Sequence, residues 1–188
     1  LIEVKFKTAS IYHKYFHFEE AAKRYDELIQ RWPNNKYAAF GAEAVLDSFA
    51  VREQFDLLNK YGRKFQTNKF LMTSKKFKTA ADKYVEGATF QLIMAANTKA
   101  VASDKRAKDK KNVDGQAIAT RMFADVAERF LAFRTEFPKS QFTPVSLVNA
   151  MMIFDRANKI DRAIDVGHVL LKEYAVDAVW KRVRKLSK

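Results

Sequence analysis

Apolar residues recur along this chain at steps of three and four, the spacing that gathers them on one face of an α-helix. Residues 18–35 show such a stripe followed by a helix-ending turn: Ala21, Tyr25, Leu28, Pro33, Asn34 and Asn35. Upstream, a second stripe consists of Phe6, Ala9, Tyr12 and Phe16. The pattern breaks near His17 and Phe18, so it predicts two helices joined by a short turn.

The same internal spacing returns twice near the end of the chain. Its members are Val126, Phe130, Phe133 and Pro138, and then Ala163, Gly167, Leu170 and Ala175. A shift of 34 residues carries Ala21, Tyr25 and Leu28 onto Phe55, Asn59 and Gly62, which are not identical. The helix–turn–helix pattern is nevertheless restated within 36–68 by Leu46, Phe49, Phe55, Leu58, Tyr61 and Phe65. One helix pair cannot bury its apolar stripes alone, so we predict stacked pairs that share a continuous core.

Residues 69–111 depart from this spacing. Their apolar positions follow steps of four and three over a long stretch: Phe77, Ala81, Tyr84, Ala88, Leu92 and Ala95. This predicts one long helix over 72–103, a charged loop near 104–115, and a second long helix over 116–137 that packs back antiparallel. The predicted segments are two helix pairs in 1–68, a long hairpin in 69–138, and a last helix pair with a basic tail in 139–188.

Composition favours an all-α fold. Five glycines and three prolines are too few for the tight turns of a sheet protein. The chain has no cysteine, which excludes disulfides, cysteine metal sites and a thiol nucleophile. The longest weakly charged stretch, 87–103, contains Gln91, Asn97 and Lys99 and is too polar to span a bilayer.

The repeated unit resembles the tetratricopeptide repeat (TPR) family, a helix–turn–helix of 34 residues. Ala9 and Ala21 match the small positions of the first unit, Tyr12 and Tyr25 its aromatic positions, and Pro33 its terminator. The resemblance is good over 1–35 and 142–176, fair over 36–68 and poor over 69–111. The phrase Phe-Pro-Lys-Ser at 137–140 is similar to the separators of divergent repeats in bacterial cell-envelope proteins.

This resemblance implies a right-handed α-solenoid with one elongated central hairpin. It also implies a non-catalytic protein–protein interaction scaffold that binds another protein or a peptide segment, within a larger protein or complex. The compartment implied is the bacterial periplasm or cell envelope, and the cytoplasm stays open. Residues 1–6 already carry a helical apolar pattern with no N-cap signal before it, so we also expect this chain to be a piece of a larger protein.

In the TPR family, peptide ligands lie in a groove lined by the first helix of each pair. Carried onto this sequence, the groove positions are Phe6, Ser10, His13, Lys14, Tyr37, Phe40, Ala44, Asp47, Val148, Met152, Asp155 and Arg156. Phe6, Tyr37 and Phe40 are large apolar side chains for an open face and would suit a partner segment. The alternative is that they pack against the neighbouring repeat or against a missing part of the chain.

Catalytic chemistry has few candidate residues. His13 and His17 are four apart on a predicted helix, the spacing at which two imidazoles can share a zinc ion, but no third ligand or catalytic glutamate stands in register. A surface or helix-end role suits both histidines better. The five glycines are isolated, so no phosphate-binding loop exists. We therefore expect no enzyme activity, no metal and no cofactor.

The net charge of +13 is unevenly distributed. Within 59–81 there are seven basic residues and no acidic one: Lys60, Arg63, Lys64, Lys69, Lys75, Lys76 and Lys78. The tail adds Lys181, Arg182, Arg184, Lys185 and Lys188. We predict that Lys64, Lys69, Lys75, Lys76 and Lys78 contact an anionic partner: nucleic acid, an anionic lipid or envelope polymer, or an acidic protein. Nucleic acid is the less favoured of these, because no base-reading motif accompanies the lysines. The alternative is a face of solvated lysines.

Overall fold

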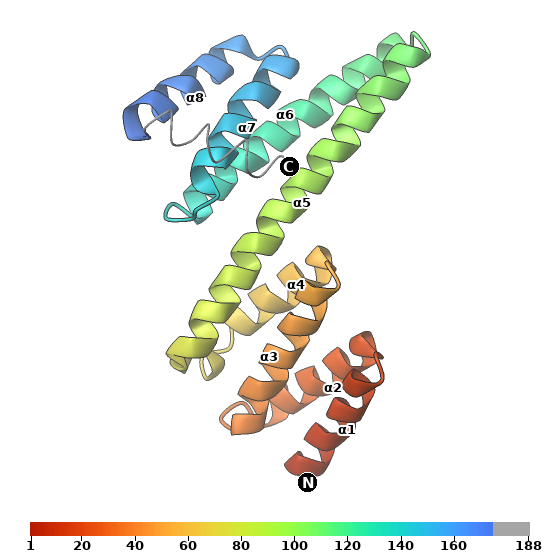
Figure 1. Cartoon of the computed structure of the whole chain (residues 1–188), viewed down its shortest axis with the longest axis vertical. Helices are drawn as coiled ribbons and strands as arrows, with labels where there is room; N and C mark the ends of the chain where they lie inside the picture. Colours follow the sequence, from red (N-terminus) through yellow and green to blue (C-terminus); the bar gives the residue numbers. More distant parts are fainter. Residues whose placement is uncertain (175–188) are drawn as a thin grey trace. The chain divides into compact units, whose positions relative to one another are not determined.

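The computed structural model describes residues 1–174, and all regular structure in this range is helical (Figure 1). Eight α-helices and one short 3₁₀-helix occur there, with no strand: α1 Ile2–Lys14, α2 Phe18–Arg31, α3 Lys36–Val51, α4 Phe55–Gln66, η1 Leu71–Thr73, α5 Lys75–Asp109, α6 Val113–Glu136, α7 Thr143–Arg156 and α8 Ile160–Glu173. The all-α class predicted from the sequence is confirmed for these residues. The basic tail predicted from Lys181 onward lies outside them.

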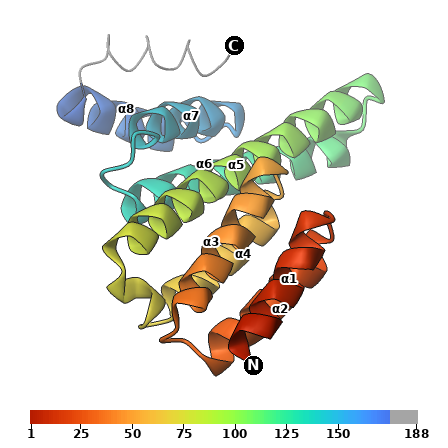
Figure 2. The same ribbon diagram turned by 60° about the horizontal axis from the view of Figure 1, so that its bottom comes forward.

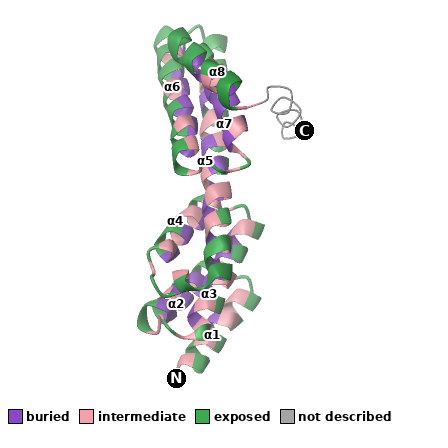
Figure 3. Cartoon of the chain, turned by 90° about the vertical axis from the view of Figure 1, so that its left-hand side faces the viewer, coloured by how far each residue is buried: buried purple, intermediate pink, exposed green. Residues whose placement is uncertain are grey.

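The chain divides into two compact units, Leu1–Thr89 (unit 1) and Phe90–Lys188 (unit 2), with the boundary inside α5. Each unit has its own cluster of buried apolar side chains. Buried and exposed positions alternate around the helices, as expected for amphipathic segments (Figure 3). The hairpin predicted over 69–138 therefore contributes residues to both units.

The turn between α5 and α6 is shorter than the predicted loop of 104–115. Helix α5 continues to Asp109, because its last turns contain neither glycine nor proline and an ion pair of 2.7 Å joins Lys108 to Asp104 one turn earlier. Helix α6 begins at Val113, and its N-cap, Asn112, accepts a hydrogen bond of 3.0 Å from the Gly115 amide.

Four turns of the same construction organise the helices. Each odd-numbered helix is followed by one residue in the left-handed region, and these residues are Phe16 (φ 66°), Glu53 (φ 55°), Lys111 (φ 50°) and Asn158 (φ 54°). The amide of the next residue then bonds back to a helix carbonyl in the Schellman pattern: His17 to Tyr12 (2.9 Å), Gln54 to Phe49 (2.9 Å), Asn112 to Ala107 (2.8 Å) and Lys159 to Phe154 (2.8 Å). The described part of the chain, residues 1–174, is thus built of four helix pairs: α1–α2, α3–α4, α5–α6 and α7–α8.

These turns correct the register of the repeat. Phe16 and Glu53 stand 37 positions apart, so the first pair maps onto the second with a shift of 37 instead of 34. Ala21, Tyr25 and Leu28 therefore correspond to Leu58, Gly62 and Phe65, and all six residues are buried. The shift of 34, which matched Ala21 to Phe55, was wrong.

Unit 1 is a stack of antiparallel helices (Figure 2). The odd-numbered helices contact one another through side chains: the rings of Phe6 and Tyr37 lie 4.8 Å apart, and Tyr84 of α5 donates a hydrogen bond to Asp47 of α3. The even-numbered helices are linked by Lys64 and Asp26, whose Nζ and Oδ2 atoms are 2.5 Å apart. We call the surface formed by α1, α3 and residues 75–89 of α5 the odd-helix face of unit 1.

Unit 2 repeats this arrangement around an aromatic cluster. Phe90 of α5 stacks on Phe142, next to the start of α7, at 4.7 Å, and lies 5.7 Å from Phe133 of α6. Two ion pairs link α6 to α8, Arg134–Glu173 at 2.6 Å and Arg162–Glu128 at 2.8 Å. We call the surface formed by residues 90–109 of α5 and by α7 the odd-helix face of unit 2. No helix within 1–174 combines the length and apolar character needed to cross a bilayer.

Candidate functional site

Most groove positions predicted on α1 are engaged within unit 1. The Phe6 ring packs against both Tyr25 and Tyr37, at 5.6 and 4.8 Å. Ser10 Oγ and Tyr25 Oη share a hydrogen bond of 3.0 Å. Lys14 is exposed. Phe6 of α1 and Tyr37 of α3 therefore pack against each other. This favours the alternative that these two aromatic residues pack against the neighbouring repeat.

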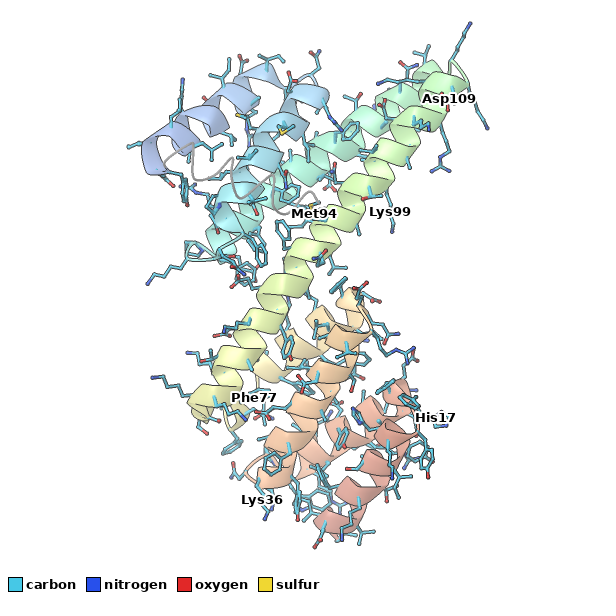
Figure 4. All side chains as sticks on the ribbon, in the orientation of Figure 1. His17, Lys36, Phe77, Met94, Lys99 and Asp109 are labelled. Atoms are coloured by element: carbon cyan, nitrogen blue, oxygen red, sulfur yellow. The ribbon has the colours of Figure 1, made fainter. Side chains whose placement is uncertain are left out.

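His13 is held by α3. Its Nε2 lies 2.5 Å from Ser48 Oγ, and the Ser48 hydroxyl donates its proton to the carbonyl of Ala44. Because that hydroxyl has only one proton, Nε2 must be the donor to Ser48. His17, which Figure 4 labels, stands at the start of α2. Its ring lies 6.2 Å from the ring of Tyr12. Neither histidine shares a partner with the other, and no group of three or more potential metal ligands occurs within residues 1–174.

On α3, the predicted positions differ in exposure. Phe40 leaves 53% of its surface exposed, whereas Ala44 is half-buried. Asp47 is exposed and accepts the hydrogen bond from Tyr84 Oη. That bond, together with partial burial, raises the pKa of Tyr84 to about 12. Phe40 is thus the one large apolar groove residue of α3 left open to a partner.

On α7, the structure corrects one position and keeps three. Val148 is only 2% exposed and belongs to the core of unit 2, so it cannot line an open groove. Met152, Asp155 and Arg156 are exposed, with 45% of Met152 accessible. Burial of Val148 follows from the helix pairing, which turns this part of α7 toward α5 and α6.

The odd-helix face of unit 2 contains two asparagines that the sequence analysis missed. Asn149 Nδ2 has the Met94 sulfur as its partner, at 3.8 Å, and sulfur is a weak acceptor. Asn97 lies one turn after Met94 on α5 (Figure 4). Its Oδ1 is buried and has no hydrogen-bond partner among the described residues. Asn149 lies three residues before Met152, which was predicted to line the groove. Residues three apart share a helix face, so this spacing is the signal that would have found Asn149. This face therefore combines hydrogen-bonding capacity that is only partly used with adaptable thioether side chains.

The basic residues of 59–81 differ in their surroundings. Lys64 is paired with Asp26, while Lys69 and Lys78 are exposed. Lys75 and Lys76 line a shallow hollow on α5 together with Lys83, Thr79, Ala80 and Tyr84. Phe77, 1% exposed, anchors the start of this helix in the core and leaves its neighbouring lysines in solvent (Figure 4).

Lys64 and Lys76 each have an acidic neighbour, and the ion pair of Lys64 with Asp26 is the shorter of the two, at 2.5 Å. Lys76 Nζ lies 3.6 Å from Glu43, yet its side chain is 85% exposed, so this pairing is weak.

Lys83, the third lysine of the hollow, was missed because it lies outside 59–81, the stretch that contains no acidic residue. It stands eight residues after Lys75, on the same helix face, which is the signal that would have found it.

No protein-family model matches this chain, and no curated protein matches it either. The surfaces with chemistry for recognition are the two odd-helix faces and the hollow on α5. The first chemistry that they offer is recognition of another chain by side-chain amides and apolar groups. The second is binding of an anion by lysines.

Proposed function

We propose that this chain is a non-catalytic protein-interaction module with the architecture of a right-handed, TPR-like solenoid. The four helix pairs closed by the same turn support this proposal, because a repeated pair is the unit from which such arrays are built. The compartment proposed is the bacterial periplasm or cell envelope, and it rests on the resemblance of the repeat separators alone.

The observation that carries the binding proposal is the pair of asparagines on the odd-helix face of unit 2. An extended peptide has unpaired backbone amides and carbonyls, and an asparagine side chain both donates and accepts hydrogen bonds. Asn149 directs one of its two amide protons at the Met94 sulfur, a weak acceptor, so exchanging that contact for a peptide carbonyl is favourable. Met94 and Met152 provide an apolar surface that adapts to different side chains. The partner is therefore an extended segment of another protein.

A random-peptide library displayed on phage tests this proposal. Selected peptides are expected to bind the purified chain, and Asn149→Ala or Asn97→Ala is expected to weaken each of them about tenfold, as the loss of one to two hydrogen bonds requires. Asn34→Ala, in an exposed turn of unit 1, is the control and should leave binding unchanged. Selected peptides that bind equally to all three variants would place the site elsewhere.

A second candidate function is supported by the hollow on α5. Three lysines, Lys75, Lys76 and Lys83, surround it, which suits an anionic group such as a phosphate of a lipid or polymer. Replacing all three by glutamate should abolish binding to anionic vesicles at low salt. Replacing Lys105, Lys110 and Lys139 instead makes the same change in net charge and should have a much smaller effect. If the two triple variants lose vesicle binding equally, the lysines act only through the net charge of the chain.

A further inference from the structure

The hollow on α5 has the outline of a site for another helix. It measures about 650 Å³ and lies along one face of α5, between residues 75 and 84. When two helices pack, a side chain of one enters a hole formed by four residues of the other, at positions i, i+3, i+4 and i+7. Lys76, Thr79, Ala80 and Lys83 occupy these positions, and all four line the hollow. The hollow therefore contains one complete hole, whose two central residues, Thr79 and Ala80, are small.

A second hole follows about one turn later on the same face. It is formed by Ala80, Lys83, Tyr84 and Gly87, which have the same spacing. Gly87 has no atom within 4 Å of the place that a Cβ would take, so this hole is open as well. All of these residues belong to unit 1. Two open holes in succession give a partner helix room for two side chains of its own seam.

The neutral polar groups of the hollow are already engaged. The Thr79 hydroxyl donates a hydrogen bond of 2.9 Å to the carbonyl of Lys75, and the Tyr84 hydroxyl donates one to Asp47 on α3. Neither hydroxyl has a proton left for a partner. An extended segment needs donors and acceptors along its whole backbone, whereas a helix satisfies its own backbone. The hollow therefore fits a helix, in contrast to the asparagines on the odd-helix face of unit 2.

The charges around the hollow select an acidic helix. Lys75 and Lys83 are exposed, and the Lys76 side chain stays 85% exposed although Glu43 lies 3.6 Å from its Nζ atom. The long lysine side chains extend past the small residues of the floor, so their ammonium groups reach the rim. Carboxylates that flank the seam of an incoming helix would meet these ammonium groups.

Two other occupants fit the hollow less well. The headgroups of an anionic bilayer would meet the lysines, but the lipid chains lie beneath the headgroups and would not reach the floor around Ala80. A second copy of this chain that presents the same face would set lysines against lysines. Of the three occupants, an acidic helix both fills the holes and neutralises the rim.

We propose that the hollow on α5 binds an acidic amphipathic helix of a partner protein, with an apolar side chain seated on Ala80 and carboxylates paired with Lys76 and Lys83. This inference rests on the second candidate function, in which the lysines of the hollow bind an anionic group, and it names the partner that carries that group.

Fluorescence anisotropy with a labelled synthetic helix tests the proposal. The probe is a peptide of heptads that has leucine along one seam and glutamate beside the seam. The wild-type chain should bind it at low salt, and a peptide with glutamine in place of every glutamate should bind about tenfold more weakly. Ala80→Leu should weaken binding of the acidic peptide about tenfold, because the larger side chain fills the first hole. Ala102→Leu, the same change at an exposed position of α5, is the matched control and should bind like the wild type.

Gly87→Leu provides a second variant, which fills the other hole. It should also weaken binding of the peptide, and it is expected to fold because no atom lies within 4 Å of the added Cβ. Circular dichroism establishes that both leucine variants are folded. If both bind the acidic peptide as tightly as the wild type does, the holes hold no helix and the inference is wrong.

Vesicles of phosphatidylglycerol separate this inference from the function on which it rests. Ala80→Leu keeps all three lysines, so it should bind the vesicles like the wild type. Glutamate in place of Lys75, Lys76 and Lys83 should abolish binding of both the peptide and the vesicles. A wild-type chain that binds the vesicles but not the acidic peptide would overturn the inference and leave anion binding by the lysines intact. A chain that binds neither probe would overturn both.

Discussion

At the scale of single residues, two glycines decide how closely the helices of unit 1 approach. Gly41 and Gly62 each face a large side chain of another helix, Tyr25 and Val85, at distances that leave no space for a methyl group. Gly87, on the same helix as Val85, has no atom within 4 Å of the place a Cβ would take. The three positions therefore separate the effect of packing from the effect of backbone entropy.

Gly62→Ala should lower the free energy of unfolding by about 1–3 kcal/mol, because the added methyl group must displace Val85 in a packed core. Gly87→Ala should raise it by about 0.5–1 kcal/mol, because alanine is the better helix former and meets nothing. Urea denaturation followed by circular dichroism measures both changes. The assignment of Gly62 to a close helix contact would be wrong if the two substitutions had the same sign.

Tyr84 links stability to pH. Its pKa is raised to about 12 from an ordinary value of 10.0, first by the hydrogen bond to Asp47 and then by burial. The folded chain holds this proton more tightly than the unfolded chain does. The corresponding stabilisation is therefore complete below pH 10 and is lost as the pH rises toward 12.

Asp47→Asn should lower the pKa of Tyr84, since the carboxylate that accepts the phenol proton is gone. Titration of tyrosinate by ultraviolet absorbance should then show one tyrosine moving to lower pH. Tyr84→Phe should remove that one late component, while Tyr25 and Tyr61, whose pKa values burial also raises, remain. Tyr15→Phe, at an exposed position on unit 1, is the control and should leave the late component in place. A late component that survives Tyr84→Phe belongs to another tyrosine.

At the scale of elements, the turn between α5 and α6 offers a test of how the helix pairs are closed. Lys111 has φ 50°, a strained conformation for a residue with a Cβ, so Lys111→Gly should stabilise the chain by about 0.5–1 kcal/mol. Its neighbour Asn112 caps α6 through the Gly115 amide, so Asn112→Ala should destabilise it by about 1 kcal/mol. Thermal unfolding of the two variants measures both changes in stability. If glycine at 111 destabilises the chain, the turn is not strained there.

These turns also show which part of the fold could be predicted from the sequence. The helix pairs were found because their apolar stripes are long and Pro33 and Pro138 mark the turns after even-numbered helices. The register was missed because the turns after odd-numbered helices are not marked by glycine. Their left-handed positions hold Phe16, Glu53, Lys111 and Asn158. With no glycine as a landmark, a family period of 34 was applied where the first repeat offset is 37.

The candidate site was predictable only where exposure follows from the helix itself. Met152 and Phe40 were predicted to lie on an open face, and both are exposed. Val148 was misplaced, because its burial depends on α5 and α6 packing over α7, which no local pattern records. Asn97 was missed for the same reason: its buried, unpaired oxygen is a property of the assembled unit and not of its sequence neighbours.

At the scale of the whole molecule, one helix takes part in two cores. Phe77, Ala81 and Ala88 of α5 belong to the apolar cluster of unit 1. Phe90, Ile93 and Ala100 of the same helix belong to the cluster of unit 2. No described residue belongs to both clusters, so each unit holds its own share of the apolar packing that stabilises the chain.

This separation predicts that damage to one core stays local. Phe130 is fully buried in unit 2, and Phe130→Ala should cost that unit about 3–5 kcal/mol through the cavity it leaves. Hydrogen exchange read by mass spectrometry should then show faster exchange in peptides from α6, α7 and α8, with α1 to α4 unchanged. Phe65→Ala in unit 1 is the reciprocal variant and should give the opposite pattern, because repeat stability is a sum of local terms. If Phe130→Ala speeds exchange equally in α1 to α4, the two cores unfold as one cooperative structure and the division into units has no thermodynamic meaning.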